Sequence, residues 1–228
     1  MLLLLVPISL AATVADLVAE MKLAAAASAD SPAVVADWRA LARDHGLADA
    51  SWKEYLAVRL AFETTRDGGL WGLRWTVTNQ PPTAAALWTQ MGAWRGEEAL
   101  ADGECDELSA LFASLARAMG VREVGLFWPR WNHTVAVWTA AGVDGNPVRI
   151  VVPTSQIYLA EGADLGTSSF DPRTQRTIYR FPTSDIPLDR VLAPAVYDRL
   201  VGSLRDVELP SSELQRRRDE RSAAVGGS

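Results

Sequence analysis

The fold of this chain turns on residues 105–128, which read CDELSALFASLARAMGVREVGLFW. Up to Gly120 the apolar residues recur every three or four positions, which is the spacing of a helix with one buried side. Beyond Gly120 they give way to a short run of β-branched and aromatic residues that is typical of a strand. The pattern predicts a helix from Cys105 to Met119, which Gly120 ends, and then a strand.

The chain before this helix carries helical patterns, and the chain after it carries strand patterns. Helices are predicted at 32–43, 48–65 and 81–94, with a loosely alternating, extended stretch at 70–79. In the second helix, Arg59 and Glu63 fall on the polar face. Strands are predicted at 121–128, 133–140, 148–152 and 177–181, before a last helix that starts near Leu188 or Pro194 and ends near Leu204. Helices followed by an antiparallel meander predict the α+β class.

Composition and charge limit the kind of protein this can be. Of the 228 residues, 49% are hydrophobic, which suits one globular domain with polar ends. We expect a signal-like segment at 1–25, a domain at 30–205, and a polar, disordered tail at 206–228. The formal net charge is −6 and the body of the chain has no basic patch, so nucleic acid is not expected as a partner.

The N-terminus resembles a secretory signal. Its first 15 residues are apolar and finish in an Ala-x-Ala-like end at Thr13-Val14-Ala15, which predicts export to a periplasmic or extracellular location. No Lys or Arg precedes Lys22, so a cytoplasmic location stays open. Because Asp16 and Glu20 interrupt the apolar run, no stable membrane span is expected.

The only cysteine of the chain opens the predicted helix at 105–119. Cys105 follows Gly103-Glu104, and His133, one of two histidines, begins a later predicted strand. The unpaired N–H groups and the dipole of a helix start stabilise a thiolate, and an imidazole within reach completes a nucleophilic pair. The adjacent carboxylates of Asp106 and Glu107 act in the opposite direction, because they raise the pKa of a thiol.

The sequence offers little support for a metal or an organic cofactor. One cysteine rules out cysteine-rich zinc sites, and the two histidines are far apart in the sequence. His45, in Arg43-Asp44-His45-Gly46, fits a polar helix end. We therefore expect no cofactor and no metal site.

At residues 103–154 the chain resembles the transglutaminase-like core of the papain-like cysteine enzymes. The similarity lies in Gly103-x-Cys105, in the helix that ends Arg117-Ala118-Met119-Gly120-Val121, in the strand at His133, and in Val152-Pro153-Thr154. The resemblance implies a papain-like fold and a thiolate mechanism that passes through an acyl-enzyme. It also implies catalytic roles for Cys105 and His133, and a protein or peptide substrate.

The chain departs from this family at one position. Val152 stands where the family has the Asp that orients the histidine. Thr154, Ser155 or Gln156 could replace that Asp, and so could Asn132, because papain-like enzymes use an Asn in this role. The family also places an aromatic or amide donor near the oxyanion, for which Gln90, Trp94 and Trp131 are the candidates here.

Three hypotheses follow from these residues. The first is a cysteine hydrolase or acyltransferase, in which Cys105 attacks a peptide or glutamine amide carbonyl and His133 moves the proton. The second is a catalytically degenerate transglutaminase-like module that binds a protein or peptide, which Val152 motivates. The third is an unrelated α+β domain in which Cys105 is a buried structural thiol.

Overall fold

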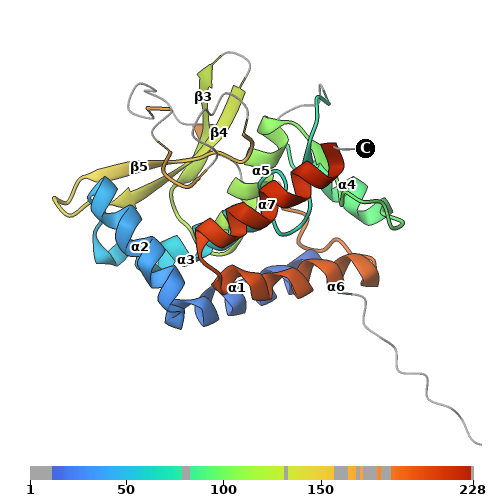
Figure 1. The fold of residues 1–228 in the computed structure, drawn as a ribbon, viewed down its shortest axis with the longest axis horizontal. Helices are drawn as coiled ribbons and strands as arrows, with labels where there is room; N and C mark the ends of the chain where they lie inside the picture. Colours follow the sequence, from blue (N-terminus) through green and yellow to red (C-terminus); the bar gives the residue numbers. More distant parts are fainter. Residues whose placement is uncertain are drawn as a thin grey trace, which may run out of the picture.

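The computed structural model describes residues 12–78, 83–130, 133–156, 164–167, 170–171, 179–180 and 186–226. Its main helices are α1 (Val14–Ala27), α2 (Pro32–His45), α3 (Trp52–Thr65), α4 (Ala85–Ala93), α5 (Cys105–Ala118), α6 (Pro194–Ser203) and α7 (Ser211–Gly226). Its strands are β1 (Arg74–Trp75), β2 (Asp102–Gly103), β3 (Val124–Arg130), β4 (His133–Ala141), β5 (Pro147–Val152) and β6 (Tyr179–Arg180). Mixed helix and antiparallel sheet confirm the α+β class (Figure 1).

The main sheet has the strand order β5-β4-β3-β6, and each neighbouring pair is antiparallel. Leu126 of β3 and Val152 of β5 both pair with Ala136 of β4. The β3–β4 register shifts between Phe127 and Arg130, a segment that contains Pro129. Proline has no N–H to give to the ladder, which accounts for an irregularity at this point.

The two faces of the sheet differ in what covers them. Helix α5 packs on β4 and β3, and its apolar stripe, Leu108, Leu111, Phe112 and Leu115, is fully buried. This face belongs to the large core that continues through α3 and α1. The opposite face carries a small separate cluster, made of Phe127, Val135, Val137, Val151 and Phe170.

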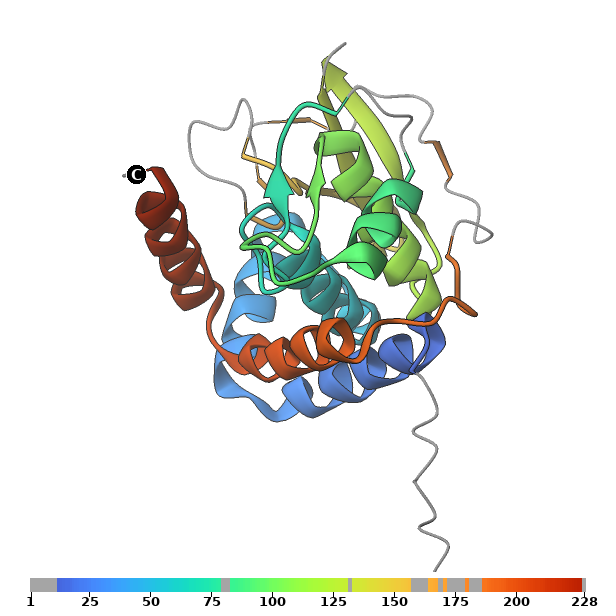
Figure 2. The same cartoon turned by 90° about the vertical axis from the view of Figure 1, so that its right-hand side faces the viewer.

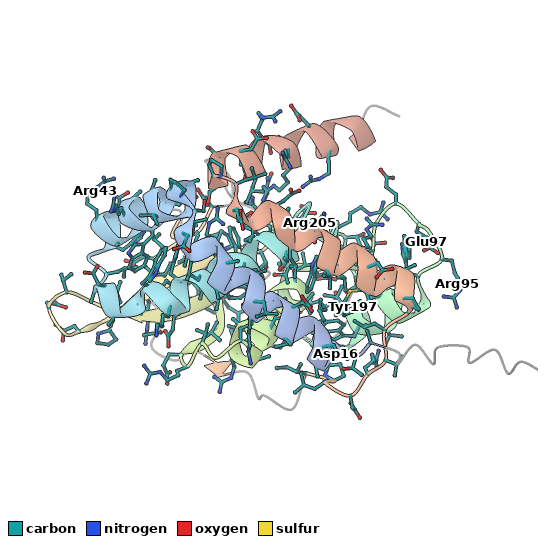
Figure 3. All side chains as sticks on the ribbon, turned by 90° about the horizontal axis from the view of Figure 1, so that it is seen from below. Asp16, Arg43, Arg95, Glu97, Tyr197 and Arg205 are labelled. Atoms are coloured by element: carbon teal, nitrogen blue, oxygen red, sulfur yellow. The ribbon has the colours of Figure 1, made fainter. Side chains whose placement is uncertain are left out.

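Helices α1 and α6 form the layer farthest from the sheet (Figure 2). Figure 3 shows this layer from below, with Asp16 of α1 near Tyr197 of α6. Thr13 caps α1, since its hydroxyl accepts from the Asp16 N–H while its own N–H donates to the Asp16 carboxylate at 2.7 Å. The chain before α6 also meets this end, because the Val14 N–H donates to the Arg190 carbonyl at 3.0 Å.

Both ends of the chain are more ordered than the sequence predicts. Within the segment expected to be signal-like, residues 14–25 belong to α1, and Val14, Leu17 and Met21 are fully buried; residues 1–11 lie outside the described part. The expectation of a disordered tail at 206–228 is wrong for 211–226, which form α7. Leu214 and Arg218, four residues apart, are buried on one side of that helix, a spacing too sparse to register as an amphipathic pattern.

Several predicted elements are shorter than expected. The stretch at 70–79 contributes only β1, which pairs in parallel with β2. Helix α4 starts at Ala85, and residues 79–82 lie outside the described part. The strand predicted at 177–181 corresponds to β6, which is described only at 179–180. The last predicted helix begins at Pro194, the later of its two expected starts.

Candidate functional site

Cys105 is the first residue of α5, as the helical pattern predicts. The helix begins with the Leu108 N–H donating to the Glu104 carbonyl at 3.0 Å, and the Glu104 N–H donates to Glu107 Oε2 at 2.8 Å. The Cys105 side chain is only 6% exposed, because α5 points its first turn against the sheet. The thiol is therefore packed inside the molecule rather than presented on a surface.

Among the described residues, the backbone of β4 gives a hydrogen bond to the sulfur. The Thr134 N–H donates to Cys105 Sγ at 3.4 Å. Burial raises the pKa of the thiol above its usual range, and the negative charges of Asp106 and Glu104 raise it further, whereas the Thr134 N–H lowers it. The net direction of the shift is upward, which disfavours the thiolate.

His133 begins β4 and is 1% exposed. Its ring lies 5.4 Å from the ring of Phe170, centroid to centroid. Alternate residues of a strand share a face, so His133 has the same orientation as Val135 and Val137, which belong to the Phe170 cluster. The structure thus brings the His133–Thr134 backbone to the thiol, while the His133 ring packs towards the face of the sheet away from α5.

Buried hydroxyl groups join the first turns of α5 to the beginning of β4 and to the chain just after β5. The hydroxyls of Ser109 and Thr154 lie 2.8 Å apart, and Ser109 also donates to the Thr134 carbonyl at 3.4 Å. Thr154 Oγ1 donates to the Cys105 carbonyl at 3.5 Å. Thr154, one of the groups that could orient His133, is therefore engaged with the Cys105 helix instead.

The other substitutes for the family Asp have contacts of their own. Val152 is fully buried in the large core, opposite Ala136, on the α5 face of the sheet. The side-chain amide of Gln156 is oriented with its oxygen towards α7, where it accepts a hydrogen bond from the guanidinium of Arg218. Asn132 lies outside the described residues.

The proposed oxyanion donors support the chain that leads into α5. Gln90 Nε2 donates to the Asp102 carbonyl at 2.8 Å, and Gln90 Oε1 accepts from the Asp102 N–H at 2.9 Å, so both ends of this amide hold β2. Trp94 Nε1 donates to the Glu97 carbonyl at 3.0 Å, and Arg199 lies over its ring. Trp131 lies outside the described residues.

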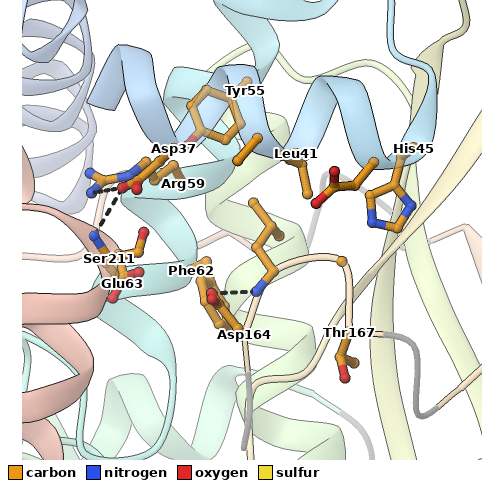
Figure 4. A pocket seen from close by; sticks show the side chains of 14 residues that line it. Asp37, Leu41, His45, Tyr55, Arg59, Phe62, Glu63, Asp164, Thr167 and Ser211 are labelled. Carbon is orange, nitrogen blue, oxygen red and sulfur yellow. Dashed lines mark hydrogen bonds and ion pairs between the residues drawn. The ribbon is translucent and has the colours of Figure 1, made fainter. Parts of the chain in front are cut away.

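A pocket of about 530 Å³ lies between α2, α3 and the segment 164–167 (Figure 4). Sequence reasoning missed it, since Arg59 and Glu63 are expected on the polar face of α3 and both side chains are in fact 2% exposed. Arg59 pairs with Asp37 at 3.2 Å and donates to the carbonyls of Val207 and Leu209. The chain around the short helix η5 (Leu204–Glu208) and the start of α7 covers this side of α3, which no local pattern indicates.

A second hollow of about 860 Å³ lies next to this pocket, along β5. The two spaces share Asp44, His45, Gly166 and Thr167 as walls, so they lie side by side, and we call them together the groove. Gly166 has a φ of +80°, and a Cβ there would stand 2.7 Å from His45 Nε2. A glycine therefore lets the loop close over His45, which is a groove residue as well as a helix end.

Among the described residues, no group of three or more His, Cys, Asp or Glu side chains could hold a metal ion. None of the helices in the described ranges combines the length and the apolar character that crossing a membrane requires. No protein-family model, curated protein or solved structure matches this chain. The geometry of the chain alone must therefore support any functional assignment.

Proposed function

We propose that this chain is a catalytically degenerate transglutaminase-like module that binds a peptide or protein. The observation that carries the proposal is the environment of Cys105, a buried thiol whose pKa is raised by desolvation and by the carboxylates of Asp106 and Glu104. A nucleophilic cysteine needs the opposite shift, towards the thiolate. Burial of Val152 in the apolar core supports the same conclusion, because that position supplies no carboxylate to the imidazole.

The groove beside α2 and β5 supports a binding role. It combines apolar walls with a few charged groups, which is the usual character of a ligand site. It is lined by neither Cys105 nor His133, so binding there does not require a working nucleophile.

The test is the pH dependence of Cys105 alkylation by iodoacetamide, measured by mass spectrometry of the intact protein. We expect slow labelling that rises only above the free-thiol pKa of about 8.5, because the thiolate is disfavoured. His133→Ala should leave this profile unchanged, and Cys105→Ala should abolish labelling. Fast labelling near pH 6 that His133→Ala removes would overturn the proposal, since it requires an activated Cys-His pair.

A second candidate function is that of a cysteine hydrolase or acyltransferase. The observation that favours it is the Thr134 N–H on Cys105 Sγ at the start of α5, because both a donor and a helix N-terminus stabilise a thiolate. In this mechanism Cys105 attacks an amide carbonyl, and water or another amine later releases the acyl group. It requires the His133 ring to turn from Phe170 towards the thiol, where it would take the thiol proton and give it to the leaving amine. Ammonia release from glutamine peptides that Cys105→Ala abolishes would establish it, and equal release by that variant would exclude it.

A further inference from the structure

A buried phenol faces the pocket between α2 and α3. Tyr55 is 2% exposed, and its side chain lines the pocket. The rings of Trp38 and Trp52 pack against its ring, with centroid distances of 5.0 and 5.7 Å. Within the described part of the chain, no hydrogen-bond partner of its hydroxyl is found. Because the Tyr55 side chain lines the pocket, its hydroxyl can form a hydrogen bond with a polar group that enters from outside.

Three carboxylates and one guanidinium act on Tyr55 in this pocket. Asp37, Glu63 and Asp164 each act on Tyr55 to raise its pKa, beyond the larger effect of burial, and Arg59 opposes them. Arg59 is already engaged by Asp37 and by two backbone carbonyls. Asp164 is exposed at the pocket, and only its own loop is known to engage it, through the Leu165 N–H at 2.7 Å.

The walls suit a cation that carries an apolar stem. Leu41 and Phe62 line the same space as Tyr55 and Asp164, and Figure 4 shows these four side chains around it. A guanidinium is planar, stacks on aromatic rings and donates in a fork to a carboxylate. An ammonium is a compact, strongly hydrated charge that matches such a flat, partly aromatic space less well.

We propose that this pocket binds the arginine side chain of a peptide whose backbone continues along the groove beside β5. The guanidinium donates to the Asp164 carboxylate and to the Tyr55 hydroxyl oxygen, and its methylene stem lies against Leu41 and Phe62. The shared residues of the two hollows give the peptide a path from the pocket towards Phe170. This inference rests on the proposed binding function and names its partner.

The experiment is fluorescence anisotropy with a labelled five-residue alanine peptide that has one central arginine. The matched peptide has citrulline, which is isosteric and neutral, and a third has lysine. The protein variants are Asp164→Asn and Tyr55→Phe, with Asp189→Asn as the control, because Asp189 is an exposed carboxylate that does not line the pocket. Far-UV circular dichroism of each variant shows whether it is folded.

We expect the arginine peptide to bind at least tenfold more tightly than the citrulline peptide, and more tightly than the lysine peptide. Asp164→Asn should weaken binding about tenfold, since it removes a charged hydrogen bond, and Tyr55→Phe should weaken it several-fold. Asp189→Asn should bind as the wild type does. Equal binding of arginine and citrulline peptides, or unchanged binding by folded Asp164→Asn, would overturn the proposal.

Ethylguanidine tests the source of the cation. If it binds as tightly as the arginine peptide, the site takes a small guanidine and the peptide assignment is wrong. Alkylation of Cys105 tests the absence of catalysis separately from peptide binding. If Cys105 is labelled slowly but no arginine peptide binds, the arginine site is wrong and the proposed absence of catalysis still holds.

Discussion

At the scale of the residue, the chemistry of Cys105 depends on its neighbours more than on its position in a helix. The helix start and the Thr134 N–H favour a thiolate, but burial and two nearby carboxylates outweigh them and raise the thiol pKa. The position of the His133 ring also depends on its surroundings. The parity of one strand position decides whether its ring meets the thiol or the Phe170 cluster.

Val152→Asp tests whether the missing carboxylate could restore a catalytic triad. We expect no gain of amide hydrolysis and a loss of about 2–4 kcal/mol in the free energy of unfolding, because the new carboxylate would enter an apolar core. Urea denaturation followed by tryptophan fluorescence measures this loss. Val152→Thr, similar in shape with one hydroxyl, should cost about 1–2 kcal/mol. A Val152→Asp protein as stable as the wild type would mean that the side chain reaches His133 or solvent.

At the scale of the element, the first and last helices show how a chain end is held by a few contacts. Helix α1 depends on the Thr13 cap and on backbone bonds to the segment before α6. Helix α7 is polar along most of its length and docks through Leu214 and Arg218, with Gln215 meeting Arg66 at 3.2 Å. Burial and the nearby Arg66 lower the pKa of Arg218 to about 10. Burying this cation therefore costs free energy, which offsets part of the stability that the docking of α7 provides.

Two truncations test the role of the start of α1. A chain that begins at Ala12 keeps the Thr13 cap and the burial of Val14, and a chain that begins at Asp16 loses both. We expect the shorter chain to be less stable by about 2–3 kcal/mol, from one cap and one buried valine. Thermal unfolding of the two chains, followed by circular dichroism, measures this difference in stability. Equal stability would make a processing site at Thr13-Val14-Ala15 compatible with the fold.

Limited trypsin digestion tests the docking of α7, which carries several arginines. Leu214→Ala should speed cleavage within 211–226 by at least several-fold, because Leu214 is one of the two side chains that are buried within residues 211–221 of that helix. Glu220→Ala is the control, since Glu220 is exposed and its known ion pair is with Arg216 of the same helix. Mass spectrometry locates the cut. Identical digestion of the two variants would show that α7 does not depend on its buried leucine.

At the scale of the whole molecule, one large core connects the sheet to the outer helices. It runs from Val14 in α1 through α3 and α5 to β4 and β5, and it reaches Val207 near the end of η5 (Leu204–Glu208). The groove borders this core, since Tyr55 and Phe62 belong to the core and also line the pocket, and its second hollow meets the smaller cluster at Val151 and Phe170. Substitutions at Tyr55 or Phe62 would therefore affect both the core and the groove, whereas Asp164 is exposed and lies outside the core.

Because the core is continuous, we expect one cooperative unfolding transition. Trp71, Trp88 and Trp138 are fully buried in the loop after α3, in α4 and in β4, so tryptophan fluorescence reports on several layers at once. Its urea midpoint should coincide with that of far-UV circular dichroism. An earlier loss of helical signal would show that the outer helices unfold as a separate part.

The local patterns predicted much of the fold. Helix α2 starts at Pro32 as expected and ends at His45, two residues past the predicted end, and α5 spans Cys105–Ala118. The strands β3, β4 and β5 fall within a few residues of their predicted ranges. For the candidate site, the sequence predicted that Cys105 begins a helix and His133 begins a strand, but it did not predict that Thr134, Ser109 and Thr154 meet at the start of α5.

By itself, the sequence determined where helices and strands form, because hydrophobic spacing and residues such as Pro32 and Gly120 act over a few positions. Only the tertiary structure decided that Arg59 and Glu63 are buried, that α7 docks, and that the His133 ring packs on Phe170. These outcomes depend on which elements cover one another. A polar side chain is buried when a distant segment closes over it, and local periodicity carries no information about that segment.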